Sequence, residues 1–225
     1  MDKNQNNDLF NQTIDARDGF WKKIGTVDPY VLTHLINPAF MGGPKWPAMR
    51  QAFVKVETPN SVILASDGLS DPFDDVEEPN QGFSLECYLE SDDPTLRKSI
   101  ADLDQTWQFQ LVYEVAQNFA QHGGVKELLE LYGVLSMEFS FIDVPEPFSD
   151  EEGRVGVLLG LESDQIPTSF MGPASDIRWV SIKVLTSQEL HYILQHGADG
   201  RKKLAELFRE QGTHHLSTLN RKSVV

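Results

Sequence analysis

Alternating hydrophobic and polar residues predict β-strands in several short stretches of the chain. The strictest alternation spans residues 83–90, where Phe, Leu, Cys and Leu face one side and Ser, Glu, Tyr and Glu face the other. A continuous apolar run at residues 62–65 predicts a buried strand, and a turn at residues 58–60 joins it to a strand over residues 53–56. Three further strands are expected near residues 135–141, 155–161 and 180–184.

Hydrophobic residues spaced three and four positions apart predict the helices. The longest such pattern spans residues 96–119 and predicts one helix, or two helices joined near Asp104. Thr186 and Glu189 form a capping box that starts another helix, and Gly197 ends it. Further helices are expected over residues 16–24, 29–36, 125–132 and 199–211.

The order of these elements predicts the fold class. Strands in hairpins and unevenly spaced helices do not follow a regular βαβ alternation. We therefore expect one α+β domain over residues 17–225, a mixed and mostly antiparallel β-sheet covered by helices. Residues 1–16 are polar, and we expect them to be poorly ordered. With 225 residues, 40% of them hydrophobic, the chain can bury a sizeable core.

The net charge of −15 narrows the range of partners. Eleven acidic residues and no Lys or Arg lie between residues 57 and 93, whereas residues 201–225 carry six basic and two acidic residues. An acidic chain repels nucleic-acid phosphate, so we expect no DNA or RNA partner. The same field attracts a basic protein. Alternatively, the acidic residues serve only solubility.

Composition also bears on location. No stretch has the roughly 18 apolar residues of a membrane helix, and the polar N-terminal residues do not resemble a signal peptide. The single cysteine excludes an internal disulfide. These features favour a cytoplasmic protein with no membrane partner.

Catalytic motifs are incomplete wherever their residues occur. Residues 68–72 begin like a nucleophile elbow, but Pro72 replaces the second glycine. Cys87 lies in phase with the apolar face of its strand, where a thiol behaves as a small hydrophobic group. His191 and His196 are five residues apart on a predicted helix and point about 140° apart. We therefore predict no catalytic residue, no metal site and no cofactor.

A stiff acidic loop (residues 67–82) is the strongest candidate for a functional site. The residues expected to bind a partner are two apolar anchors and five acids around them, namely Leu69, Phe73, Asp71, Asp74, Asp75, Glu77 and Glu78. In one alternative, Phe73 packs onto the core and the acids only solvate the loop. In another, residues 67–78 hold a metal ion in an enzyme, although their spacing departs from a calcium-binding loop.

Short motifs spread over residues 30–225 resemble the suppressor-of-fused family. In chain order they are Met41-Gly42-Gly43-Pro44, Gly68-Leu69-Ser70-Asp71, Gly82-Phe83 with Glu86, Leu185-Thr186 with Glu189-Leu190, and the closing Asn220-Arg221 and Ser223-Val224-Val225. Each motif is short, and their common order and spacing carry the resemblance.

The resemblance implies a non-enzymatic, protein-binding α+β domain. Animal members restrain a transcription factor of Hedgehog signalling by binding a short extended peptide with the help of a second domain, for which a chain ending at Val225 has no room. The chain therefore resembles the stand-alone bacterial type, whose members are proposed to be immunity proteins. On this basis we expect an inhibitor that binds and neutralises a toxin protein. The alternative is an adaptor domain in a larger assembly, and the oligomeric state is left open.

Overall fold

A computed structural model describes residues 3–225 of the chain. Its strands are β1 (Thr26–Val27), β2 (Leu32–Thr33), β3 (Ala52–Glu57), β4 (Val62–Asp67), β5 (Leu85–Ser91), β6 (Leu135–Ser140), β7 (Arg154–Leu159), β8 (Ser169–Met171) and β9 (Asp176–Val184). Its helices are α1 (Lys3–Ile24), α2 (Trp107–His122), α3 (Val125–Tyr132) and α4 (Ser187–Glu210), with short 3-10 turns η1 (Pro38–Met41), η2 (Pro94–Arg97) and η3 (Ile100–Asp102).

The strands form one mixed sheet in the order β1-β3-β4-β5-β9-β7-β6, with β2 beside β3 and β8 beside β9. Among residues 3–225 every strand pair is antiparallel except β5 with β9. The predicted hairpin is present, with Val54 opposite Ala65. The predicted fold class, a single α+β domain with a mostly antiparallel mixed sheet, is therefore confirmed.

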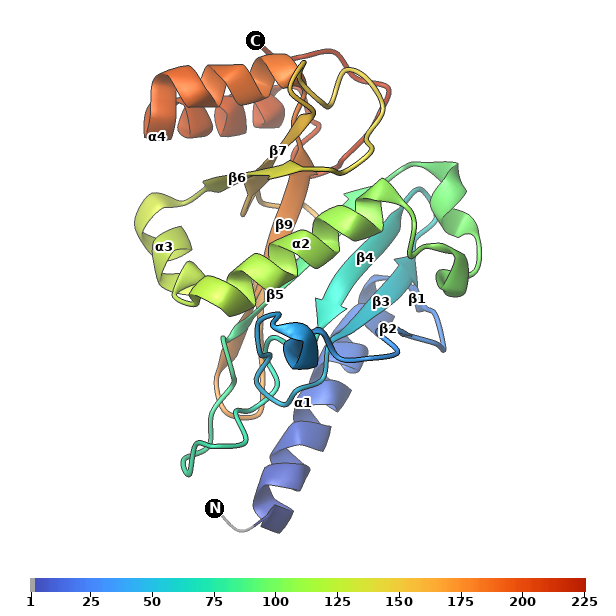
Figure 1. Ribbon diagram of the computed structural model, residues 1–225, viewed down its shortest axis with the longest axis vertical. Coiled ribbons are helices and arrows are strands. Elements are labelled where there is room, and N and C mark those ends of the chain that lie inside the picture. The colour runs from blue at the N-terminus through green and yellow to red at the C-terminus, as the bar shows by residue number, and fades with distance from the viewer. Residues whose placement is uncertain (1–2) are drawn as a thin grey trace.

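Helices cover both faces of the sheet. Figure 1 shows α2 crossing one face, where Leu111 and Val115 pack into a core with Cys87 of β5. On the opposite face, Phe20 and Trp21 of α1 pack against a second apolar cluster of β3, β4 and β9. Strands β4 and β5 are buried on both faces because each one lies between two helical layers.

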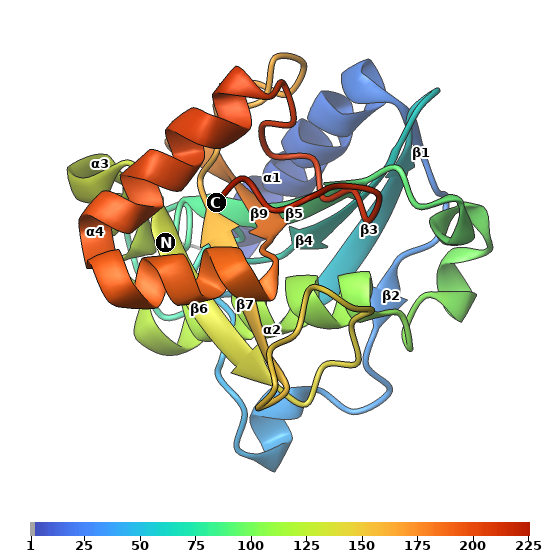
Figure 2. The same cartoon turned by 90° about the horizontal axis from the view of Figure 1, so that it is seen from above.

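Helix α4 bends at Gly197, where the sequence predicted that one helix ends before a second one over residues 199–211. This glycine has φ 57° and ψ −128°, a conformation that L-residues rarely adopt, and helical geometry resumes beyond it. Figure 2 shows the angle between the two parts of α4. The capping box is present as predicted, since Thr186 accepts from the Glu189 amide and the Glu189 carboxylate accepts from the Thr186 amide.

Two predicted helices differ from the structure. Residues 29–36 form turns and β2, because Asp28 accepts from the Tyr30 amide in a local turn and β2 pairs with β3. The helix expected from residue 96 begins only at Trp107, where Thr106 caps it. The 3-10 turns η2 and η3 precede it and bury their apolar side chains without continuous helix.

Helix α1 is longer than the pattern predicted. It begins at Lys3 rather than at residue 16, and Leu9 and Thr13 of the segment expected to be poorly ordered are buried. Arg17, on the same side of the helix, is only 2% exposed. An arginine so deeply buried requires partners, and they lie in the acidic loop.

Candidate functional site

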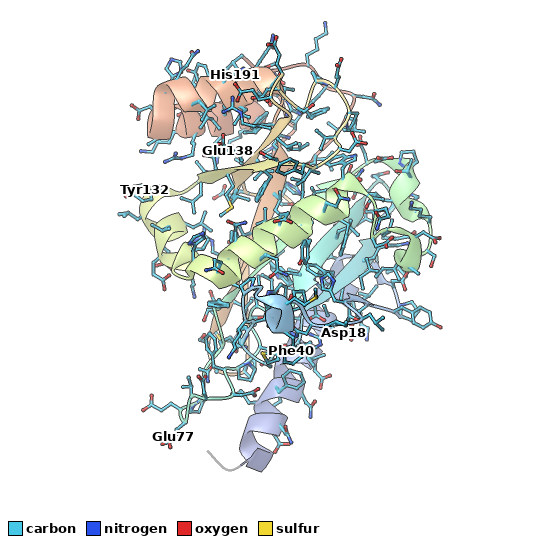
Figure 3. All side chains as sticks on the ribbon, viewed as in Figure 1. Asp18, Phe40, Glu77, Tyr132, Glu138 and His191 are labelled. Atoms are coloured by element: carbon cyan, nitrogen blue, oxygen red, sulfur yellow. The ribbon has the colours of Figure 1, made fainter. Side chains whose placement is uncertain are left out.

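The acidic loop connects β4 to β5 and extends from one end of the sheet, with Glu77 near its tip (Figures 1 and 3). Its two halves have opposite environments. Residues 67–72 are buried, whereas residues 74–79 are exposed. We refer to these halves as the loop base and the loop tip.

Arg17 of α1 holds the loop base. Its Nε lies 2.6 Å from Asp67 Oδ1, its Nη2 lies 2.5 Å from Asp71 Oδ1, and its Nη1 donates to Ser70 Oγ at 2.8 Å. Together with Glu86, whose Oε1 lies 3.5 Å from Arg17 Nη1, these residues form what we call the Arg17 cluster. Charged groups with geometry this close fix two distant chain segments against each other.

Glu86 shapes the backbone of the loop base. Its Oε1 accepts from the Gly68 amide at 3.0 Å, from the Ser70 amide at 3.0 Å and from Ser70 Oγ at 2.7 Å. Its Oε2 accepts from Ser66 Oγ at 2.5 Å. Because these donors precede and follow the turn after β4, the Glu86 carboxylate serves as the template around which the loop begins.

The Arg17 cluster contains more negative than positive charge, and its pKa values reflect this. Burial alone would raise the pKa of Asp67, but Arg17 and Arg50 hold it below its ordinary value. Burial raises the pKa of Asp71 to about 6 despite the same two arginines. Within residues 3–225, Asp71 Oδ2 accepts no hydrogen bond, and Arg50 Nη1 lies 3.7 Å away. Within the cluster, the negative charge of Asp71 is therefore stabilised less well than that of Asp67.

The structure corrects the prediction for two of the candidate partner-binding residues. Leu69 is fully buried and packs into the main core, and Asp71 is fully buried against Arg17. Leu69 and Asp71 thus support the loop rather than present a surface to a partner.

The other five candidates lie in the outer part of the loop. Phe73 is half-buried and packs edge-on against Phe83, with ring centroids 5.3 Å apart. Asn80 closes the turn, since its Oδ1 accepts from the Phe73 amide at 2.7 Å. The four acids Asp74, Asp75, Glu77 and Glu78 are exposed. The loop tip is therefore a carboxylate-rich projection on a fixed base.

The sequence pattern does not single out the residues that hold this loop. It places Glu86 on a polar strand face and does not extend the first helix as far as Leu9. A helix through Leu9 and Thr13 puts Arg17 on the buried side, in line with Trp21. A lone arginine on an apolar helix face is a signal for a buried carboxylate partner.

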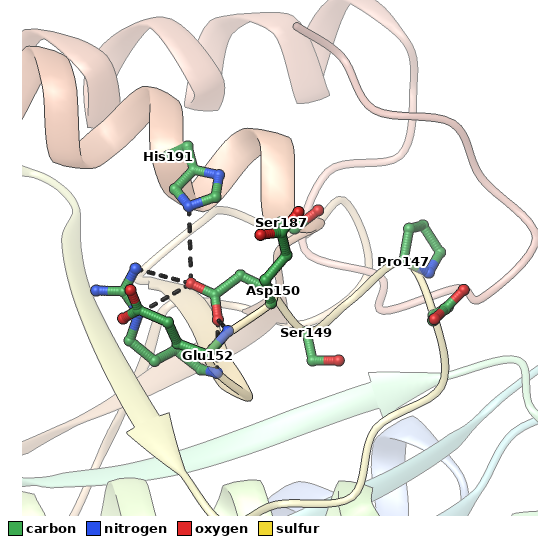
Figure 4. Close-up of a pocket in the computed structure, with 9 residues that line it drawn as sticks. Pro147, Ser149, Asp150, Glu152, Ser187 and His191 are labelled. Atoms are coloured by element: carbon green, nitrogen blue, oxygen red, sulfur yellow. Dashed lines mark hydrogen bonds and ion pairs between the residues drawn. The ribbon is translucent and has the colours of Figure 1, made fainter.

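A cavity of about 500 Å³ lies between the 146–154 segment and the start of α4 (Figure 4). Asp150 is one of the residues that line this cavity. The carboxylate oxygens of Asp150 accept hydrogen bonds from the amides of Glu152 and Arg154 and from Arg154 Nε at 2.8–3.0 Å. His191 Nε2 lies 3.7 Å from the same carboxylate. Asp150 thus fixes its own turn, and its hydrogen bonds within that turn lower its pKa.

Other candidate chemistry is limited in the described part of the chain. Among residues 3–225, no group of three or more His, Cys, Asp or Glu side chains is placed to hold a metal ion. Cys87 is buried in the core, and burial raises the pKa of its thiol. None of the helices in this range is long and apolar enough to cross a membrane.

Comparison with known proteins identifies the fold. No family model and no curated protein sequence matches the chain. The solved structure of a Sufu-Fu complex matches 96% of this chain and 92% of its own chain, with a TM-score of 0.56 and 15% identity. The chain has a suppressor-of-fused fold. A structure of Drosophila Suppressor of Fused also matches, with a TM-score of 0.53, 15% identity and 94% of this chain covered, and the chain spans 50% of its length.

The motifs that resemble the suppressor-of-fused family have structural tasks in this fold. Those around residues 68–86 build the Arg17 cluster. Those near the end build what we call the Arg221 cluster, in which Arg221 Nη1 and Nη2 lie 2.5 and 2.6 Å from the two Glu189 oxygens. Glu189 also accepts from the amides of Thr186 and Val224. The motifs therefore specify how the fold is anchored, and they do not by themselves mark a binding site.

Proposed function

We propose that the chain is a cytoplasmic protein-binding domain without catalytic activity, an immunity-type inhibitor that binds and neutralises a basic toxin protein. One observation carries the proposal: four exposed carboxylates project from the loop tip, while Arg17 and Glu86 hold the loop base. Fixed charge on a projecting loop steers an oppositely charged protein to one face and accelerates its association. The structural neighbour described as the Sufu-Fu complex supports protein binding by this fold.

Phe73 adds an apolar contact to this acidic surface. It is half-buried beside Phe83, so part of its ring remains accessible next to the exposed acids. An apolar residue surrounded by charged ones is typical of the centre of a protein interface. We therefore include Phe73 with Asp74, Asp75, Glu77 and Glu78 in the proposed surface.

The first experiment is affinity capture of partners from the native host, followed by binding kinetics and a growth assay with the captured protein. Replacing Asp74, Asp75, Glu77 and Glu78 by Lys is expected to slow association at least about tenfold at low salt. The matched control places the same four charges on exposed acids elsewhere, Asp102, Asp104, Glu127 and Glu130.

The outcomes separate the possible functions. Restored growth when the chain is co-expressed with a basic toxin would support the immunity role. Capture of a basic partner whose activity is unaffected would instead indicate an adaptor. An unchanged association rate for the loop variant would remove the loop tip from the interface. The metal-assisted enzyme has less support, because Arg17 already engages Asp67 and Asp71.

A further inference from the structure

One ordered segment of the chain exposes an unusual number of large hydrophobic side chains. Six of them occur within residues 30–41, with exposed fractions from 44% to 102%, and we call them the apolar ridge: Tyr30, Val31, Leu35, Ile36, Phe40 and Met41. Single exposed hydrophobic residues are ordinary, but a concentration of them marks an interaction surface.

Polar side chains hold the backbone of this segment in place. Asn37 Oδ1 accepts from the Ala39 amide at 2.9 Å, and Asn37 Nδ2 donates to the Met49 carbonyl. Gln51, which is buried, donates to the Pro44 carbonyl at 3.1 Å and accepts from Gln117 of α2 at 2.8 Å. The backbone of this segment is anchored to the sheet and to α2, and the ridge side chains are exposed. Binding of a partner would therefore cost little backbone conformational entropy.

The segment that follows the apolar ridge packs against the base of the acidic loop. The segment that follows the ridge carries Trp46, whose ring comes within 3.0 Å of an ideal Cβ on Gly68, and Pro47, whose Cγ comes within 2.8 Å of one on Gly82. Figure 3 shows Phe40 and Glu77 in the same half of the molecule. Residues 46 and 47 therefore connect the segment that carries the ridge to the base of the loop that carries the tip.

Charge decides what kind of partner fits. A second copy of this chain would bring another net charge of −15 and another acidic loop to the same surface, which Coulomb repulsion opposes. A partner with basic residues beside its apolar contact would be attracted by the loop tip instead.

We infer that the apolar ridge and the loop tip form one docking surface for a protein that presents an apolar face bordered by Lys or Arg. This inference rests on the proposed function in taking the partner to be basic, and it adds the contact that retains the partner after encounter. Surface charge mainly sets the association rate, whereas apolar contacts at the centre of an interface mainly set the dissociation rate.

The test uses a labelled synthetic amphipathic helix with Leu on one face and Lys on the other, titrated against the full chain by fluorescence anisotropy. The double variant Leu35→Ser/Phe40→Ser is expected to weaken binding at least about tenfold. The matched control Leu131→Ser/Phe141→Ser changes two side chains that are also exposed, at 71% and 102%, and should stay within about twofold. A peptide with the same Leu face but Glu in place of Lys should bind more weakly than the Lys peptide.

Each outcome decides the matter. No binding of the Lys peptide, or equal losses in ridge and control variants, would overturn the docking surface. Urea unfolding of both variants checks that these exposed substitutions leave the fold intact. Failure of the growth assay with intact ridge-dependent peptide binding would remove only the immunity role. Conversely, a ridge variant that retains a captured basic toxin at full affinity would remove only this inference.

Discussion

Two arginines with buried side chains anchor distant parts of this molecule, and they differ in the number of carboxylates that each one faces. Arg17 joins α1 to the acidic loop and faces Asp67, Asp71 and Glu86. Arg221 joins the C-terminal segment to α4, and within residues 3–225 it forms an ion pair with Glu189 alone, through two parallel contacts. The first cluster has surplus negative charge, whereas in the second, one arginine neutralises one carboxylate.

A neighbouring lysine makes the contrast sharper. Lys183 of β9 is almost fully buried, donates to the Leu216 carbonyl at 2.7 Å and lies over the Phe208 ring near Arg221. Burial, together with the charge of Arg221, lowers the pKa of Lys183 to about 7. The region around Arg221 thus holds two cations opposite Glu189 and Asp92, whereas the region around Arg17 carries surplus negative charge. Loss of the arginine should destabilise the two regions by different amounts, and their buried titratable groups should respond oppositely to pH.

The largest effect is expected from Arg17→Met. This substitution leaves three buried carboxylates without their main cation, and removal of one partner from a buried ion pair typically destabilises a protein by about 3–5 kcal/mol. Urea unfolding at pH 7 measures the change. Lys22→Met is the control on the same helix, since the Lys22 side chain is 64% exposed and its ion pair with Asp18 should contribute under about 1 kcal/mol.

Hydrogen exchange would show where the Arg17→Met variant is weakened. The amides of Gly68 and Ser70, which donate to Glu86, should lose protection before those of the rest of the sheet. A variant that unfolds within about 1 kcal/mol of the parent chain would show that the carboxylates find other partners.

Arg221→Met should destabilise the chain less, by about 2–4 kcal/mol, because it leaves only one carboxylate, that of Glu189, without its cation. That carboxylate keeps the amide donors of Thr186 and Val224. Arg221→Lys should recover only part of the loss, since a lysine cannot form the two-pronged pair. The same urea titrations rank the variants, and a loss larger than that of Arg17→Met would contradict the contrast between the clusters.

Local patterns in the sequence predicted the parts of these clusters that depend on neighbouring residues. The capping box at Thr186 and Glu189 and the break in helical geometry at Gly197 could be predicted because each depends only on residues within one turn. The strands on either side of the acidic loop are likewise visible from their apolar runs. The motifs also led to the correct fold, although at 15% identity the solved structures show no more than that.

Contacts between distant segments could not be predicted in the same way. Arg17 meets Asp71 across 54 positions, and the residues around Asp71 give no sign that it is buried or that Arg17 is its partner. The place of Leu69 in an acidic loop predicted that it contacts a partner, whereas the turn imposed by Glu86 directs it into the core. The apolar ridge was not predicted because a helix was expected over residues 29–36. In the structure, pairing of β2 with β3 outweighs the local helix signal.

Lys183 provides a pH test of the region around Arg221. Its pKa is lower in the folded chain than in the unfolded one, so the unfolded chain binds more protons between about pH 7 and pH 10. Stability should therefore rise with pH in this window, by about 2 kcal/mol from pH 7 to pH 9. Urea unfolding of Lys183→Met should lack this increase, and identical slopes in both proteins would mean that Lys183 stays charged in the fold.

Asp71 provides the opposite and smaller pH test. Its pKa of about 6 in the folded chain lies above the ordinary value of 3.8, so the folded chain binds more protons between these values. Its contribution should therefore lower stability as pH rises from about 4 to 6, by about 1–2 kcal/mol. Asp67 and Glu90 have lowered pKa values, so their contributions to stability fall as the pH falls and oppose that of Asp71. The contribution of Asp71 is therefore isolated by comparing the parent chain with Asp71→Asn. Relative to the parent chain, Asp71→Asn should gain stability across this window, and Asp75→Asn, at an exposed position of the same loop, is the matched control. A constant difference between the parent and Asp71→Asn would show that Arg17 and Arg50 together keep Asp71 ionised.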